Sequence, residues 1–163
     1  MSKQNNSYIS LRVPKKGPFW NVENPHITLA FFRDISPEEI ADALPTDLEQ
    51  GSITLHTTGA GIWRGQQGGR DPYWIVYASV DQVQTGQYLR SLRAFVLSEL
   101  DLHTILPDRT FDFTPHITVW IGEGLKNAQE RLPLTSGEPF RFTVDTLYIS
   151  RPGRSDEALT VKL

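Results

Sequence analysis

The amino-acid sequence predicts an α+β fold in which two sheets rich in antiparallel strands face a central cleft, with the helices on the outside. The predicted strands come in adjacent pairs between helices, which argues against a purely parallel doubly wound sheet. The two halves of the chain have a similar order of elements, and each contains one Pro-His-Ile-Thr strand. A chain of 163 residues can bury one core. We therefore expect a single domain over residues 1–163 with two pseudo-symmetric lobes.

The first half of the chain predicts two strands and a helix. Residues 8–13 and 26–32 alternate apolar and polar side chains, as half-buried strands do. The expected apolar row of the second strand is Ile27, Leu29 and Phe31. A helix is expected to begin after Ser36, which can cap it, because proline follows at the first helical position and glutamate at the third.

The second half repeats this alternation of strands and helices. Residues 52–58 and 73–80 predict strands on either side of a glycine-rich stretch that begins at Gly65. Residues 86–100 have apolar side chains at the spacing of an amphipathic helix packed on a sheet. The remaining expected elements are a strand over 116–121, a short helix over 125–132, one long strand over 140–150 and a closing strand over 158–163.

The composition limits the classes of partner. The formal net charge is −3, whereas proteins that grip long nucleic acids usually carry a basic excess. The chain contains no cysteine, so disulfides and thiolate metal sites are excluded. No stretch has the length and apolarity of a membrane span, and the first ten residues lack the apolar core of a signal peptide. We expect a cytoplasmic protein with no membrane association, and nothing indicates an obligate protein partner.

The repeated tetrapeptide is the main candidate for a functional site. Successive side chains of a strand point to opposite faces, so His26 and Thr28 project together while the intervening Ile27 enters the core. His116 and Thr118 project together in the same way, and Ile117, Val119 and Ile121 are expected to be buried. Two surface-facing polar pairs on ordinary strands are the alternative for either copy alone. The matched pairs together favour a site.

Two imidazoles and two hydroxyls suit general acid–base chemistry at phosphorus. Histidine titrates at about 6.5, so near neutrality one imidazole can accept a proton while the other donates one. The hydroxyls of Thr28 and Thr118 can donate to the non-bridging phosphate oxygens. No pair of histidines has the helical spacing of a zinc site and threonine is a poor metal ligand, so we expect neither a metal nor a cofactor. The pattern leaves open which histidine is the base.

At the level of motifs, the sequence resembles the two-histidine (2H) phosphoesterase superfamily. The segments "WNVENPHITLAFF" and "DFTPHITVWIG" resemble its two His-x-Thr/Ser motifs, and "VDTLYISRPG" resembles its late strand. The resemblance covers nearly the whole chain and implies a bilobal α+β fold. It implies that His26 and His116 are the acid and base, and that Thr28 and Thr118 bind phosphate.

The resemblance also implies the reaction class, a metal-independent hydrolysis or transesterification of nucleotide phosphodiesters. Substrates of the superfamily include 2′,3′-cyclic phosphates, 2′–5′ linkages, RNA ends and the cyclic oligonucleotide signals that some phage anti-defence members cleave. We expect a small nucleotide or a cyclic oligonucleotide as the substrate. Two alternatives stay open: a protein that sequesters a nucleotide in the same cleft, and an enzyme that processes or ligates RNA ends.

Aromatic and basic residues near the motifs are candidates for binding the substrate, since bases need stacking surfaces and phosphates need local positive charge. Strand alternation places Trp120 on the face of His116 and Thr118. The other candidates are Tyr8, Arg12, Tyr148, Ser150 and Arg151. Two weaker candidates, Trp20 and Trp63, are explained at least as well by core packing, and a solvated surface explains Arg64, Arg70 and Arg154 better than binding does. The remaining histidines, His56 and His103, are expected to be structural or surface residues.

Overall fold

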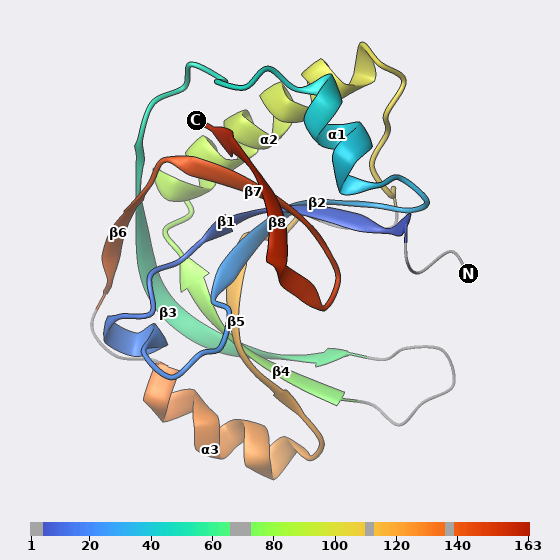
Figure 1. Cartoon of the computed structure of the whole chain (residues 1–163). Helices are drawn as coiled ribbons and strands as arrows, with labels where there is room; N and C mark the ends of the chain where they lie inside the picture. The colour runs from blue at the N-terminus through green and yellow to red at the C-terminus, as the bar shows by residue number, and fades with distance from the viewer. Residues whose placement is uncertain (1–4, 66–72, 110–112, 136–138) are drawn as a thin grey trace.

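The computed structural model describes residues 5–65, 73–109, 113–135 and 139–163. Within these ranges strands and helices follow the predicted order except over residues 140–150 (Figure 1). The strands are β1 (Ser7–Arg12), β2 (His26–Phe32), β3 (Ile53–Gly65), β4 (Tyr73–Val80), β5 (His116–Gly122), β6 (Arg141–Val144), β7 (Thr146–Arg151) and β8 (Arg154–Lys162). The helices are α1 (Pro37–Ala43), α2 (Thr85–Asp101) and α3 (Leu125–Thr135), with a short 3-10 helix η2 at Gly17–Phe19.

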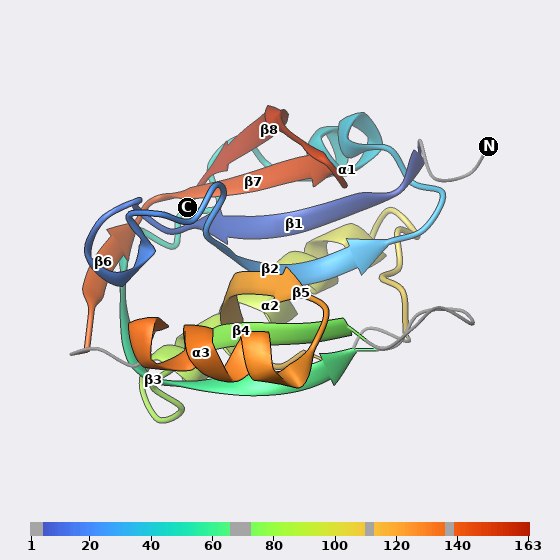
Figure 2. The same cartoon turned by 90° about the horizontal axis from the view of Figure 1, so that it is seen from below.

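The strands form two four-stranded antiparallel sheets. The first has the order β2-β1-β7-β8 and the second the order β5-β4-β3-β6. The two orders correspond strand by strand, so β2 and β5 occupy equivalent edge positions. These two edge strands also contact each other, and Figure 2 shows them adjacent where the sheets meet. The predicted α+β fold with two antiparallel sheets is confirmed.

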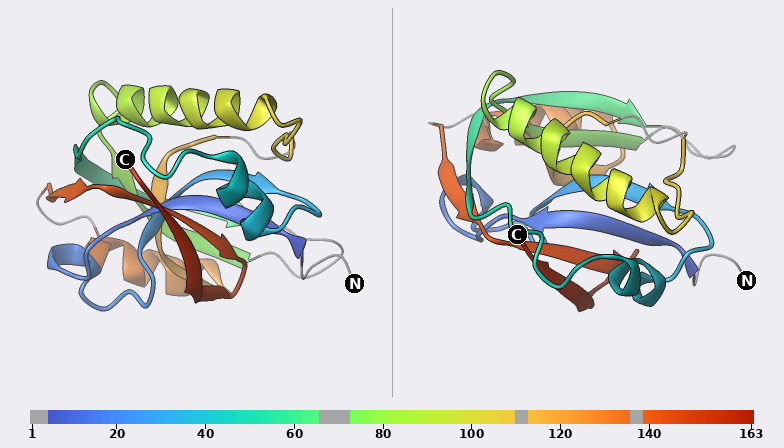
Figure 3. Two further views of the ribbon diagram at one scale, coloured as in Figure 1. Left: turned by 45° about the horizontal axis from the view of Figure 1, so that its top comes forward. Right: turned by 90° about the horizontal axis from the view of Figure 1, so that it is seen from above.

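The helices lie outside the strands (Figure 3). Helix α1 packs against β7 and β8, α2 against β2 and β3, and α3 against β3, β4 and β5. The capping of α1 follows the sequence prediction, because the Ser36 hydroxyl accepts a hydrogen bond from the Glu39 N–H at 3.2 Å. The core that these elements share includes Ile27 and Ile117, which are fully buried. None of the helices in the described ranges has the length and apolarity needed to cross a membrane.

The expectation of one long strand over residues 140–150 is wrong. The segment forms β6 and β7, which pair with β3 and β1 and therefore belong to different sheets. The break falls at Asp145, whose carbonyl accepts a hydrogen bond from the N–H of Leu163 at 2.9 Å instead of joining a ladder. An apolar alternation that continues through Asp145 does not reveal this change of sheet.

Each motif strand contains a β-bulge at the same position of the motif. On β2, Thr28 pairs with Ser10 and Ala30 with Ile9, so Leu29 has no partner across β1. On β5, Thr118 pairs with Tyr77 and Trp120 with Val76, so Val119 has no partner across β4. An extra residue reverses the alternation of every residue that follows it.

The bulges correct three burial predictions. Phe31 was expected in the buried row of Leu29, but it pairs with Tyr8 and is only half-buried. On the other strand Val119 is half-buried and Ile121 is 59% exposed, although both were expected in the core. Straight alternation fails in both strands because it cannot anticipate the extra residue.

Candidate active site

The first motif shares a face of the first sheet with polar side chains of the neighbouring strand. His26 pairs with Arg12, and Thr28 pairs with Ser10 on β1. Directly paired residues of antiparallel strands project to the same face, so these four side chains lie together. We call them, with Tyr8, the polar half of the site. The Tyr8 ring lies 5.5 Å from the His26 ring, measured between centroids.

The second motif has aromatic neighbours instead. His116 pairs with Ser79, and Thr118 pairs with Tyr77 on β4. The ring of Trp63 stacks on that of Tyr77 with centroids 4.0 Å apart, and its edge meets the His116 ring at 4.5 Å. We call Trp63 and Tyr77 the aromatic platform. The two lobes therefore share a topology but surround their histidines with different chemistry.

Both imidazoles are held by the same hydrogen bond. His26 Nδ1 lies 2.7 Å from the carbonyl oxygen of Asn24, and His116 Nδ1 lies 2.7 Å from that of Thr114. A carbonyl oxygen only accepts hydrogen bonds, so each Nδ1 carries the proton. The neutral rings therefore present Nε2 as an acceptor. In both motifs a proline separates the histidine from the residue whose carbonyl it contacts. This polar residue followed by proline is the sequence feature that the two histidines share.

The environment of His116 favours its neutral form. Burial lowers the pKa of His116 below its ordinary value, because a charged imidazolium loses hydration there. The positive charge of His26 lowers this pKa further, whereas the Thr114 carbonyl partly opposes the shift. His26 therefore lies close enough to His116 for the two rings to interact electrostatically.

Four of the candidate substrate-binding residues gather around His26. On β1, Tyr8 pairs with Ser150 of β7 and Ser10 pairs with Tyr148. The Arg12 guanidinium lies over the Tyr148 ring at 4.0 Å, and Arg12 Nη2 donates to the carbonyl oxygen of Ser155. Tyr8, Arg12, Tyr148 and Ser150 thus share the face of His26.

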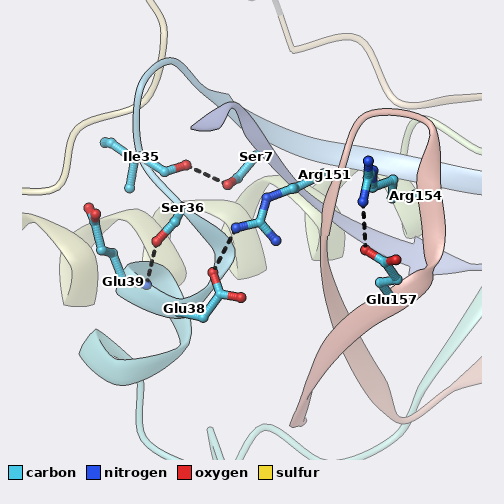
Figure 4. A network of polar contacts seen from close by, with 8 residues as sticks. All are labelled: Ser7, Ile35, Ser36, Glu38, Glu39, Arg151, Arg154 and Glu157. Carbon is cyan, nitrogen blue, oxygen red and sulfur yellow. Dashed lines mark hydrogen bonds and ion pairs between the residues drawn. The ribbon is translucent and has the colours of Figure 1, made fainter. Parts of the chain in front are cut away.

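Two candidates lie elsewhere. The bulge at Val119 pairs Trp120 with the fully buried Val76, so Trp120 points to the sheet face opposite Thr118, and its expected position beside His116 is wrong. Arg151 Nη2 donates to the Glu38 carboxylate of α1 at 3.1 Å, so Arg151 points toward α1 (Figure 4). Arg154 Nη1 lies 3.5 Å from Glu157 on its own strand.

The aromatic platform was largely missed by the sequence reasoning. The sequence leaves Trp63 as a weak candidate that core packing explains equally well, and nothing in its pattern indicates Tyr77. The available signal was Gly61, which pairs with Tyr77, because a Cβ there would lie 2.3 Å from Tyr77 Oη. Glycine at this position lets the tyrosine ring lie across β3 and reach Trp63.

The weaker candidates have other surroundings. Arg64 and Trp20 are exposed, Trp20 by 70%, and Arg70 lies outside the described residues, as does most of the glycine-rich stretch after Gly65. His103 is exposed beyond α2. His56 lines a separate cavity of about 710 Å³ between α2 and the strands β3 and β6. In the described part of the chain, no three acidic or histidine side chains cluster as metal ligands would.

Comparison with known proteins identifies the family. The model of the 2′-5′ RNA ligase superfamily matches residues 10–156, which include both motifs. The chain belongs to this superfamily of two-histidine phosphoesterases. Such membership makes it an enzyme of the phosphodiester-cleaving type. No curated protein sequence matches significantly.

Solved structures agree on the fold. The structure of Kluyveromyces marxianus Usb1 is similar with a TM-score of 0.62 and 11% identity, and the match covers 99% of each chain. Escherichia coli LigT, solved in complex with 3′-AMP, has a TM-score of 0.59 and 20% identity over 98% of this chain and 95% of its own. A structure described as a phosphoesterase has a TM-score of 0.58 and 19% identity over the same shares.

Proposed function

We propose that the chain is a metal-independent phosphodiesterase that cleaves small nucleotide phosphodiesters with its two His-x-Thr motifs. The observation that carries this proposal is the matched pair of imidazoles on adjoining edge strands, each with Nδ1 bonded to a carbonyl and Nε2 left for substrate. A sequestering protein needs no such matched proton acceptor and donor, so hydrolysis accounts for the arrangement better than binding alone.

The environments of the two rings support a division of roles. His116, whose pKa is lowered by burial, is the neutral base near pH 7 and takes a proton from the attacking water through Nε2. The water oxygen forms a bond to phosphorus while the bond to the leaving ribose oxygen breaks. His26 Nε2 gives its proton to that leaving oxygen. One proton enters the protein and one leaves it, so the site regains its net charge.

The threonines and the halves of the site account for binding. The hydroxyls of Thr28 and Thr118 donate to the non-bridging oxygens, where negative charge grows in the transition state. The aromatic platform offers a stacking surface for a base, worth about 1–3 kcal/mol in single-stranded nucleic-acid complexes. In the polar half, Arg12 supplies a positive charge beside the reaction centre.

The substrate class follows from scale and charge. A net charge of −3 disfavours binding along a polynucleotide. The positive charge of Arg12, which pairs with His26, lies at the site itself and suits a small anionic ligand. We therefore favour 2′,3′-cyclic phosphates, 2′–5′ linked dinucleotides and cyclic oligonucleotide signals, as a phage anti-defence enzyme would cleave. LigT, which shares the fold, was solved with the mononucleotide 3′-AMP, which is compatible with a small ligand.

The substrate class is tested by a mass-spectrometric screen. The purified protein and its His26→Ala variant are incubated with 2′,3′-cyclic mononucleotides, 2′–5′ oligoadenylate, cyclic di- and trinucleotides, and RNA with a cyclic phosphate end. We expect cleavage of a small substrate by the wild type and none by the variant. Product from the RNA alone would contradict the substrate class. A ligand that binds but returns intact would contradict catalysis.

A further inference from the structure

The distance between the two histidines is not set by a sheet ladder. His26 and His116 lie on β2 and β5, which are edge strands of different sheets. In-line displacement nevertheless requires both rings at fixed positions on opposite sides of phosphorus, because reacting groups must be held close to their productive geometry. Some contact between the lobes must therefore position the two motifs relative to each other.

Arg93 of α2 contacts the backbone of the first motif. Its Nε donates a hydrogen bond to the carbonyl oxygen of Leu29 at 2.8 Å. Leu29 is the bulge residue of β2, directly after Thr28, and has no partner across β1. The hydrogen bond therefore holds the strand at the point where its regular pairing is interrupted.

The same guanidinium contacts the approach to the second motif. The Arg93 guanidinium carbon lies 5.1 Å from the centroid of the Phe113 ring, within the range of a cation–π contact. Phe113 precedes Thr114, whose carbonyl holds the His116 ring. One side chain thus touches both motif segments within a few residues of each histidine.

The surroundings of Arg93 distinguish it from an ordinary surface arginine. Arg93 is half-buried, and burial lowers the pKa of its guanidinium. Burying a charged group costs free energy because the group loses hydration. The contacts of the Arg93 guanidinium with the Leu29 carbonyl and the Phe113 ring offset this cost. Arg90, one turn earlier on the same helix, is exposed, and its Nη2 donates to Gln82 Oε1 of the same surface at 3.2 Å.

We propose that Arg93 is a positioning residue that sets the spacing of His26 and His116 by joining Leu29 to Phe113. Among the described residues between α2 and β5, Asp108 also contacts this strand: its N–H donates to the carbonyl of Phe31 at 2.7 Å, and its carboxylate pairs with Arg33 just after β2. Both contacts are at the opposite end of β2 from His26, so they constrain the histidine less directly.

The catalytic consequence rests on the proposed function. A misplacement of about 1 Å costs on the order of 100-fold in rate. Arg93→Met keeps the length and packing of the side chain but removes the donor and the charge. We expect its kcat to fall roughly 10- to 100-fold while KM changes less than about threefold, because Arg93 contacts Leu29 and Phe113 and acts on the positions of the motifs. Arg93→Lys keeps the positive charge and can still donate a hydrogen bond, so its kcat should lie between those of the wild type and Arg93→Met.

A distance measurement tests the positioning role without any substrate. The chain has no cysteine, so spin labels attach only to Glu23→Cys and Glu123→Cys, two exposed positions beside the two motif strands. Double electron–electron resonance should give a narrow distribution of the distance between the two labels, both in the labelled protein and in the same protein with Arg90→Met added. Adding Arg93→Met should broaden or shift the distribution, and Arg93→Lys should do so to a smaller extent.

The outcomes separate the two proposals. If the distance distributions of Arg93→Met and Arg93→Lys are as narrow as that of Arg90→Met, the positioning role is overturned, whatever the activity of the variants. Should the methionine variant not fold, the lysine variant decides. A wild type that cleaves none of the phosphodiesters would refute the proposed function, while the distance distributions still decide the role of Arg93. A kcat that both Arg93 variants retain in full would also overturn it.

Discussion

Truncating two isoleucines of β5 separates the bulged register from straight alternation. Ile117 is completely buried in the core, whereas Ile121, four residues later on the same strand, is 59% exposed. Without the bulge at Val119 the two side chains would belong to one buried row. With it, Ile121 pairs with Ile75 on the face that carries His116. The comparison therefore tests which side chains surround the second motif.

The expected costs differ widely. Ile117→Ala leaves a cavity in a core that cannot fully collapse, so the free energy of unfolding should fall by about 2–5 kcal/mol. Ile121→Ala removes a mostly solvated side chain and should cost at most about 1 kcal/mol, the span of strand propensities. Urea titration followed by tryptophan fluorescence measures both values, and an unchanged m-value shows that the transitions are comparable. Equal losses for the two variants would refute the bulge, and with it the position of Trp120 away from His116.

Three further predictions concern the histidines and the aromatic platform. Nitrogen-15 NMR at neutral pH should show Nδ1 protonated in both His26 and His116, and a neutral ring protonated only on Nε2 in either would contradict the carbonyl hydrogen bonds. Because the pKa of His116 is lowered in the fold, its contribution to stability is present above the unfolded value of about 6.5 and is lost as the pH falls through the lowered pKa. His116→Gln should therefore reduce the pH dependence of the unfolding free energy as the pH falls below about 6.5, and an unchanged slope would contradict the lowered pKa. Gly61→Val should displace Tyr77 and weaken binding of a mononucleotide in calorimetry, whereas Gly59→Val is the matched control, since a Cβ there meets nothing within 4 Å. Equal affinities for these two variants would remove the platform from the site.

The motif strands and the first helix were predictable because their signals are local. Alternation located β2 at the bounds that the structure shows, and Ser36 with Glu39 located the start of α1. The burial of Ile27 and Ile117 also followed from period two, since both precede the bulges. For the same reason the histidine and threonine of each motif could be assigned to one face.

The remaining features depend on pairing between distant segments. A bulge is defined by the pairing with the partner strand, so the residues Leu29 and Val119 do not by themselves predict it. The faces expected for the residues after each bulge were therefore wrong. The break at Asp145 is accompanied by a hydrogen bond from the N–H of Leu163, a residue distant in the sequence. Trp63 reaches His116 only because β3, β4 and β5 pair in the observed register. Single-sequence periodicity contains none of this information.

The central claim is that two imidazoles perform the proton transfers without a metal. The most direct measurement is the rate of hydrolysis of the best small phosphodiester in excess EDTA by the wild type, His26→Gln and His116→Gln, each verified as folded. We predict that the wild type keeps its full rate with the chelator, and that each variant loses about 10²- to 10⁴-fold in kcat, as expected for removal of a general acid or base. A rate that the chelator abolishes, or either single variant at the wild-type rate, would contradict the claim.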